Sequence, residues 1–149
     1  MTRFKTALSL WVLALGISAC GGEQWTDHQG NSVDREELAG RWLVVNYWAD
    51  WCGPCREELP ELNALAEQYP DIAVLGINFD GVTGQALQDM SDSMEIRFPV
   101  MGHDFAAAMN LPLPQVLPTT YVLSGEGAIV HTLQGPQDKA ALLAVTVDE

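Results

Sequence analysis

Residues 44–62 read VVNYWADWCGPCREELPEL, and this stretch decides most of what the sequence predicts about the fold. It begins inside Trp42–Trp48, an almost continuously apolar run that is typical of a strand covered on both faces. From Pro54 onward the apolar residues recur at helical spacing. A second apolar run at Ile72–Phe79 completes a strand–helix–strand unit. This unit predicts two parallel strands joined by a right-handed crossover.

Two cysteines, Cys52 and Cys55, lie where the first strand turns into the helix. At this spacing they can close a disulfide across one turn, and Pro54 suits the first turn of a helix. The positive end of the helix dipole and the unpaired N–H groups there stabilise a thiolate. Cys52 is therefore the candidate nucleophile that attacks a substrate disulfide. Cys55 would then resolve the mixed disulfide and leave a redox-active Cys52–Cys55 disulfide.

The cysteine pair leaves three other interpretations open. A structural zinc site needs two further ligands, but the chain has no second Cys-x-x-Cys, and His28, His103 and His131 are scattered. An inert structural disulfide is the second interpretation. A noncatalytic Cu(I) carrier that uses the same two sulfurs is the third. Because no third sulfur or histidine stands at motif spacing, the sequence favours the enzyme and predicts neither a metal site nor a cofactor.

The motif resembles the thioredoxin superfamily, specifically its TlpA/ResA-like branch of exported, membrane-attached thiol-disulfide reductases. A second marker is Leu117-Pro118-Thr119-Thr120-Tyr121-Val122, which resembles the cis-proline segment of that family. The resemblance covers residues 33–149. It implies an α/β thioredoxin-like fold, with a central mixed sheet flanked by helices, an N-terminal extension and an inserted helix.

The resemblance also implies roles for residues around the cysteines. A cis Pro118 would put the Leu117 backbone beside the Cys52 sulfur, where it can pair with an extended substrate segment. Trp51 is expected to cover the disulfide as an apolar rim. With Gly53 and Pro54, these residues make up the predicted substrate-binding surface. The segment Leu111-Pro112-Leu113-Pro114-Gln115 looks longer than the family pattern, which leaves the local substrate contacts open.

One position departs from thioredoxin itself. Thioredoxins have a buried aspartate six residues before the first cysteine, and this chain has Asn46 there, which cannot accept a proton. The TlpA/ResA branch instead has a glutamate three residues after the second cysteine, which is Glu58 here. We expect Glu58 to exchange a proton with Cys55. The alternative is that Glu58, between Glu57 and Glu61, is a solvated charge on the helix.

The rest of the chain predicts further elements around this unit. A turn at Asp27-His28-Gln29-Gly30-Asn31 indicates a small edge hairpin within Gln24–Val33. The turn Ser124-Gly125-Glu126-Gly127 indicates a second hairpin. The remaining expected elements are helices at Gly84–Glu95, Asp104–Asn110 and Lys139–Val147, a short strand at Phe98–Met101, and the hairpin strands Thr119–Leu123 and Ala128–Leu133.

The first residues have the pattern of an export signal. Arg3 and Lys5 precede the apolar run Ala7–Ile17, which is too short to span a bilayer comfortably. Small residues then lead to Cys20, and this resembles the lipobox of bacterial lipoproteins, in which the cysteine receives the lipid. We therefore divide the chain into a signal peptide (1–19), a segment with the lipidated Cys20, a tether and the edge hairpin (20–32), and a thioredoxin-like domain (33–149). An ordinary soluble secreted protein is the alternative.

Composition limits the function classes. The 149 residues include 20 acidic and 7 basic side chains, for a formal net charge of -13, which argues against nucleic-acid binding. A hydrophobic fraction of 48% is ordinary for a globular domain and argues against disorder.

The expected protein is a reductase of disulfides in exported proteins, and disulfide oxidation or isomerisation is the closest alternative. The resemblance implies a lipid-anchored position on the periplasmic side of a bacterial membrane, with the outer membrane favoured. It also implies a membrane electron donor of the DsbD or CcdA type and substrates that include apocytochrome c thiols.

Overall fold

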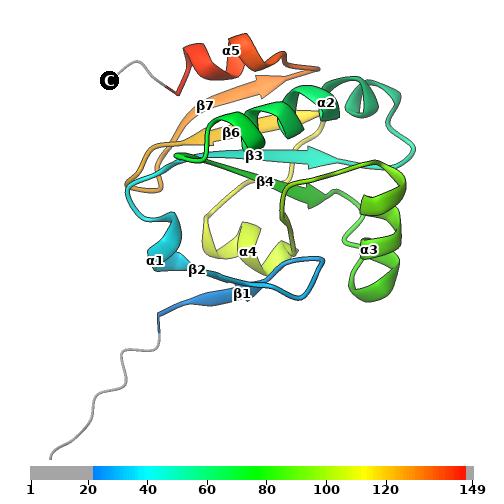
Figure 1. Ribbon diagram of the computed structural model, residues 1–149, viewed down its shortest axis with the longest axis horizontal. Helices are drawn as coiled ribbons and strands as arrows, with labels where there is room; N and C mark the ends of the chain where they lie inside the picture. Colours follow the sequence, from blue (N-terminus) through cyan, green and yellow to red (C-terminus); the bar gives the residue numbers. More distant parts are fainter. Residues whose placement is uncertain (1–21, 147–149) are drawn as a thin grey trace, which may run out of the picture.

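One five-stranded mixed sheet forms the centre of the molecule, and its strands lie in the order β5–β4–β3–β6–β7 (Figure 1). The structure, a computed structural model, describes residues 22–146. Strand β3 pairs in parallel with β4 and antiparallel with β6, so both halves of the sheet meet on it. The strands are β1 (Gln24–Thr26), β2 (Ser32–Asp34), β3 (Trp42–Trp48), β4 (Ile72–Asn78), β5 (Val100–Met101), β6 (Thr119–Leu123) and β7 (Ile129–Gln134).

Helices cover both faces of the sheet (Figure 1). Helices α2 and α5 lie on one face, and α1, α4 and the β1–β2 hairpin lie on the other. The helices are α1 (Arg35–Leu38), α2 (Gly53–Gln68), α3 (Gly84–Ser93), α4 (His103–Ala108) and α5 (Lys139–Ala144). This arrangement is the expected α/β architecture. Within residues 22–146, no helix has the length and apolar character that crossing a bilayer would require.

The alternation of side chains along β3 explains why the sheet has two cores. Val44 and Trp48 point into the core under α2, whereas Val45 and Tyr47 point into the core under the hairpin and α4. All four side chains are at most 1% exposed. Burial of β3 on both faces is the reason that its sequence is an unbroken apolar run.

Several elements differ from the sequence-based expectation. The β1–β2 hairpin is a separate two-stranded sheet, although its turn covers the edge of β5: the His28 N–H donates to the Val100 carbonyl at 2.9 Å. Strand β5 begins only at Val100, after Pro99, which has no N–H to donate to a neighbouring strand. Helix α1 has no counterpart among the expected elements, because a single turn shows no apolar periodicity. Helix α5 ends at Ala144 instead of reaching Val147.

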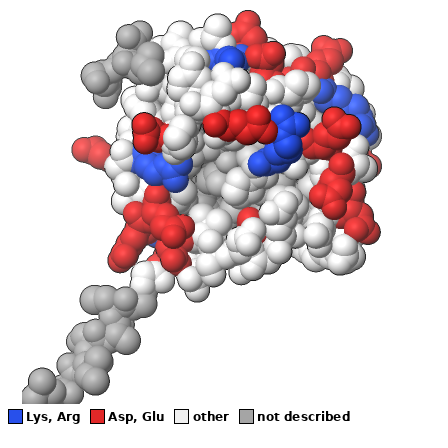
Figure 2. Space-filling model, in the orientation of Figure 1, with Lys and Arg blue, Asp and Glu red and all other residues white. Residues whose placement is uncertain are grey.

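Charged side chains are spread over the surface. On the face shown in Figure 2, acidic side chains occur over several elements, and the fewer basic side chains lie among them. The two salt bridges among the described residues, Arg35–Glu23 and Arg97–Glu67, are both exposed. No broad basic surface is present on this face, in keeping with the acidic composition.

Candidate functional site: the Cys52–Cys55 disulfide and the buried Glu58

The two motif cysteines form a disulfide at the beginning of α2. Their Cα atoms are 5.3 Å apart, and the S–S distance is 2.07 Å. Cys52 is the N-cap residue of the helix, and its Sγ accepts a hydrogen bond from the Cys55 N–H at 3.2 Å. In the reduced protein, this donor and the positive end of a 16-residue helix both favour a thiolate at Cys52.

The two sulfurs differ in their access to solvent. Cys52 is 5% exposed and Cys55 is completely buried. The neighbouring Gly53 and Pro54 are exposed. Apart from the adjacent residues and the backbone of the same helix, no described atom lies within 4 Å of the position that a Cβ atom would take at Gly53. A substrate sulfur can therefore approach Cys52 from the side of Gly53, whereas Cys55 is reached only from within the protein.

Trp51 stands beside the disulfide and is 64% exposed. Its indole N–H donates to Oδ2 of Asp80 at 2.8 Å, and its ring meets Phe79 edge to face at a centroid distance of 6.3 Å. Both partners follow β4, so the end of that strand fixes the indole. The ring is an exposed apolar surface next to the cysteines. Sequence reasoning missed the role of Asp80, because no local pattern connects it with Trp51.

The Leu117–Pro118 peptide bond is cis, as the resemblance implied. Leu117 packs against the apolar cluster that contains both cysteines. In the segment before it, Leu113 is 60% exposed and Val116 is 48% exposed. The unusual proline-rich segment therefore presents apolar side chains to solvent just ahead of the cis bond.

Glu58 lies inside the protein, only 1% exposed, so it is not a solvated helix charge. Its Oε1 accepts from Nδ2 of Asn46 at 2.6 Å, and its Oε2 accepts from the backbone N–H of Gln137 at 3.1 Å. The same Asn46 nitrogen donates to Oγ1 of Thr120 at 3.0 Å. Strand β3 and the segment before α5 thus each donate to one carboxyl group that lies one helical turn after Cys55, and strand β6 bonds the Asn46 amide beside it.

Burial raises the pKa of Glu58 to about 7, because removal from water disfavours the charged carboxylate. The hydrogen bonds from Asn46 and Gln137 act in the opposite direction, since both donate to the charged form. The balance leaves a carboxyl group that changes its protonation state near neutral pH. A pKa in this range suits a group that takes up and releases protons during catalysis.

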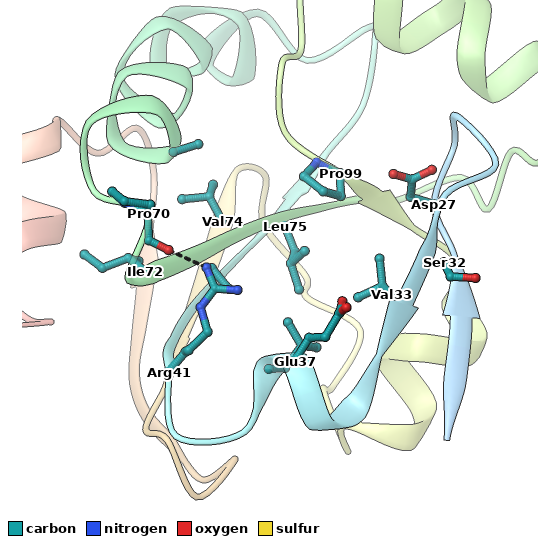
Figure 3. Close-up of a pocket in the computed structure, with 13 residues that line it drawn as sticks. Asp27, Ser32, Val33, Glu37, Arg41, Pro70, Ile72, Val74, Leu75 and Pro99 are labelled. Atoms are coloured by element: carbon teal, nitrogen blue, oxygen red, sulfur yellow. Dashed lines mark hydrogen bonds between the residues drawn. The ribbon is translucent and has the colours of Figure 1, made fainter. Parts of the chain in front are cut away.

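A cavity of about 390 Å³ lies away from the disulfide, between the β1–β2 hairpin, α1 and the edge of β4. Figure 3 shows Arg41 at this cavity, where its guanidinium donates to the Pro70 carbonyl at 2.6 Å. Neither cysteine lines the cavity. This cavity is therefore not the place of the thiol chemistry.

Among residues 22–146, no group of three or more His, Cys, Asp and Glu side chains is arranged to hold a metal ion. The two sulfurs are bonded to each other in this state, so any Cu(I) would have to bind the reduced protein. Cys20, the expected lipidation site, and the signal peptide lie outside the described residues.

A thioredoxin-like fold with a Cys-x-x-Cys disulfide at the N-terminus of a helix defines a thiol-disulfide oxidoreductase. The profile of the AhpC/TSA family matches residues 22–132, and the chain belongs to that family.

Known proteins agree with this class. The thiol-disulfide oxidoreductase ResA of Bacillus cereus is 28% identical over 118 residues, which cover 78% of this chain and 68% of ResA. The crystal structure of StoA from Bacillus subtilis shares the fold at 21% identity, with a TM-score of 0.66 and coverage of 80% of this chain and 92% of StoA. The pneumococcal exposed lipoprotein thioredoxin Etrx1 from Streptococcus pneumoniae shares it at 20% identity, with a TM-score of 0.68 and coverage of 84% and 97%.

Proposed function

We propose that this protein reduces disulfides of exported proteins by dithiol–disulfide exchange, with Cys52 as the nucleophile and Cys55 as the resolving cysteine. The observation that carries the proposal is the asymmetry of the pair. Cys52 is the N-cap residue of the helix and is 5% exposed, whereas Cys55 is completely buried. Disulfide oxidation or isomerisation at the same pair is the closest alternative.

The exchange proceeds in two displacements. In the first, the Cys52 thiolate attacks one sulfur of the substrate disulfide, forms a mixed disulfide and releases the other substrate sulfur as a thiolate. In the second, the Cys55 thiolate attacks Sγ of Cys52 and releases the remaining substrate thiolate. The substrate leaves with two thiols, and the protein keeps the Cys52–Cys55 disulfide. Two electrons have then passed from the protein to its substrate.

Glu58 is proposed to accept the proton that Cys55 must lose before the second displacement. It lies one helical turn after Cys55, and both side chains are buried. Water has little access to a completely buried thiol, so an internal base is needed. A carboxyl group with a pKa of about 7 can take this proton and later return it to solvent.

Substrate contacts are assigned to Trp51, Gly53, Pro54, Leu117 and Pro118. The first three are exposed next to Cys52, and Leu117 is a partly buried side chain that packs against the cluster with the two cysteines. The exposed apolar side chains of the preceding segment, Leu113 and Val116, extend this surface. An extended, partly apolar segment of an unfolded or flexible protein fits such an open site.

The first prediction concerns the direction of electron flow. We expect a reduction potential near or below about -250 mV for the Cys52–Cys55 pair, since thioredoxin lies near about -270 mV and the oxidant DsbA near about -120 mV. The chain starting at Gly21 is equilibrated in graded dithiothreitol buffers, and the thiols are counted by alkylation. A value above about -150 mV would instead mean that the protein donates disulfides, and the reductase proposal would be wrong.

Cys20 is proposed to anchor the protein, lipidated, on the periplasmic side of a bacterial membrane, with the outer membrane favoured. The lipobox pattern and the charged, apolar signal sequence support this proposal. Several acyl chains on one residue bind a membrane firmly, because each buried CH₂ contributes about 0.8 kcal/mol.

We predict that Cys20→Ala moves the full-length protein from the membrane fraction to the soluble fraction. The measurement is fractionation of cells expressing the full chain, followed by immunoblotting. The matched control is Cys52→Ala, which also removes one cysteine and is expected to stay with the membrane. Membrane association of the Cys20→Ala protein would show that another part of the chain provides the anchor.

A reductase in an oxidising compartment must itself be reduced after each turnover. We therefore propose a membrane electron donor of the DsbD or CcdA type, and we include apocytochrome c among the candidate substrates. Both assignments rest on the TlpA/ResA resemblance. A mixed disulfide trapped with Cys55→Ser in cells of the source organism would identify the substrate directly, and capture of no heme-binding protein would count against apocytochrome c.

A further inference from the structure

The amide of Asn46 joins the two hydrogen-bonding groups beside it, and both of these groups can reverse their roles. Its Nδ2 donates to Oε1 of Glu58 at 2.6 Å and to Oγ1 of Thr120 at 3.0 Å. A hydroxyl donates or accepts as its O–H rotates, and a carboxyl group accepts when charged and donates when protonated. A change in the protonation of Glu58 therefore changes whether a neighbouring group must donate or accept the hydrogen bond.

The other end of the same amide is unsatisfied. Oδ1 of Asn46 is buried and has no hydrogen-bond partner among the described residues. If the amide turned by half a revolution, Oδ1 would face Glu58 and Thr120, and the nitrogen would become the unpaired end. Each orientation leaves one end of the amide without a partner. The preferred orientation therefore depends on whether Glu58 is charged and accepts a hydrogen bond, or is protonated and donates one. A charged carboxylate favours the nitrogen, and a protonated carboxyl group favours the oxygen.

We propose that Asn46 is a positioning residue for proton transfer at Glu58, donating to the charged carboxylate through Nδ2 and turning to accept from the protonated carboxyl through Oδ1. The proposal rests on the role of Glu58 proposed above. The transferred proton goes from Sγ of Cys55 to a carboxyl oxygen of Glu58 and then to solvent. Asn46 neither gains nor loses a proton, and Thr120 turns its hydroxyl with the amide.

The causes of the shifted pKa of Glu58 are burial, which raises it, and the hydrogen bonds from Asn46 and Gln137, which lower it. The nearby carboxylates of Glu61 and Asp138 accept backbone N–H groups of α5 at 3.0 and 2.7 Å, and the ammonium of Lys139 donates to Gln68. Besides Glu58, the titratable groups on the surrounding elements are Cys55, Arg56, Glu57, Glu61 and Glu67 on α2, Tyr47 on β3, Tyr121 on β6, His131 on β7, and Asp138 and Lys139 at the start of α5. Tyr47 and Tyr121 belong to the core on the other face of the sheet.

The test is a carbon-13 NMR titration of the Glu58 carboxyl group in the oxidised chain starting at Gly21, which contains every described element. In the oxidised protein, neither cysteine titrates, because both sulfurs are in the disulfide. The carboxyl carbon of Glu58 is assigned as the signal that is missing from the spectrum of Glu58→Gln. We expect Asn46→Ala to raise the Glu58 midpoint by about one pH unit, a tenfold change in proton affinity. The variant loses the bond to each form of Glu58, but the bond to the charged carboxylate is charge-assisted and therefore the stronger of the two. In the wild-type protein, the Asn46 side-chain amide signals should shift with the same midpoint as the carboxyl carbon.

Two further variants make the test decisive. Asn46→Asp keeps the size of the side chain, so it can replace Asn46→Ala in the titration if the alanine variant does not fold. We expect the last proton of that carboxyl pair to leave at least about one unit above the wild-type midpoint. Asn63→Ala removes a different buried amide, which lies on α2 and bonds the backbones of Glu95 and Arg97 instead of Glu58, and is expected to leave the midpoint unchanged.

Several results would overturn the proposal: an unchanged Glu58 midpoint in the Asn46 variants, an equal shift in Asn63→Ala, or Asn46 amide signals that stay constant across the titration. The titration uses oxidised protein without substrate, so its outcome does not depend on reductase activity. A wild-type protein that fails to reduce disulfides would contradict the proposed function alone.

Discussion

A Cys52→Ser chain is expected to lose at least about a thousandfold of its disulfide reduction rate, because a serine hydroxyl is not ionised near neutral pH and is a far poorer nucleophile toward sulfur than a thiolate. The side chain differs by one atom and is nearly isosteric, so the fold should persist. The rate is measured as the reduction of insulin disulfides by the chain starting at Gly21, which has no cysteine other than Cys52 and Cys55.

Cys55→Ser is the matched control for this loss. It also removes one sulfur of the pair, but it leaves Cys52, the proposed nucleophile, intact and blocks only the second displacement. The variant should therefore accumulate a mixed disulfide with its substrate, visible as a covalent adduct on a nonreducing gel that dithiothreitol removes. Formation of the adduct by Cys52→Ser instead would reverse the two roles. Full activity in either variant would contradict the exchange mechanism.

The sequence predicted the parts of the site that follow from local pattern. Strands β3 and β6 have the expected bounds. The apolar run of β3 is buried on both faces, and β6 begins directly after the Leu117–Pro118 bond. The position of Cys52 at the start of α2 follows from the adjacency of strand, cysteine and helix in the chain. The resemblance to the thioredoxin superfamily added the cis peptide bond, which periodicity alone does not reveal.

The environment of Glu58 was beyond such patterns. Its neighbours Glu57 and Glu61 are also acidic, so the local sequence is equally compatible with a solvated helix face. Its burial depends on contacts with Asn46, 12 residues away, and with Gln137, 79 residues away. Asn46 gave a partial signal, because an amide inside an apolar strand needs a buried partner. Gln137 gave none, because it contributes only its backbone N–H, which every residue except proline carries.

Glu58→Gln is expected to change how the stability of the oxidised protein depends on pH. The folded pKa of Glu58 is about 7, above its ordinary value of 4.5, so between these values the folded state binds more protons than the unfolded state. The carboxyl group therefore lowers the free energy of unfolding as pH rises from about 4.5 to 7. A difference of about 2.5 units corresponds to about 3 kcal/mol at full ionisation. Glutamine does not titrate, so the variant should gain about this much relative to wild type between pH 4 and pH 8.

The measurement is urea unfolding of both oxidised proteins across this pH range, with Glu57→Gln as the control, because it removes the same charge from an exposed position on the same helix. The quantity compared is the pH dependence of the difference in free energy of unfolding between wild type and Glu58→Gln. Glutamine also bonds Asn46 and Gln137 differently from a carboxylate, but that effect does not depend on pH and therefore cancels. Parallel stability curves for wild type and Glu58→Gln would show that Glu58 does not titrate between these pH values, and it would then be unable to accept the Cys55 proton near neutrality. If the curves diverge as expected, the same variant should also slow release of the mixed disulfide and remove the rise of that rate near pH 7, because the internal base for Cys55 is gone.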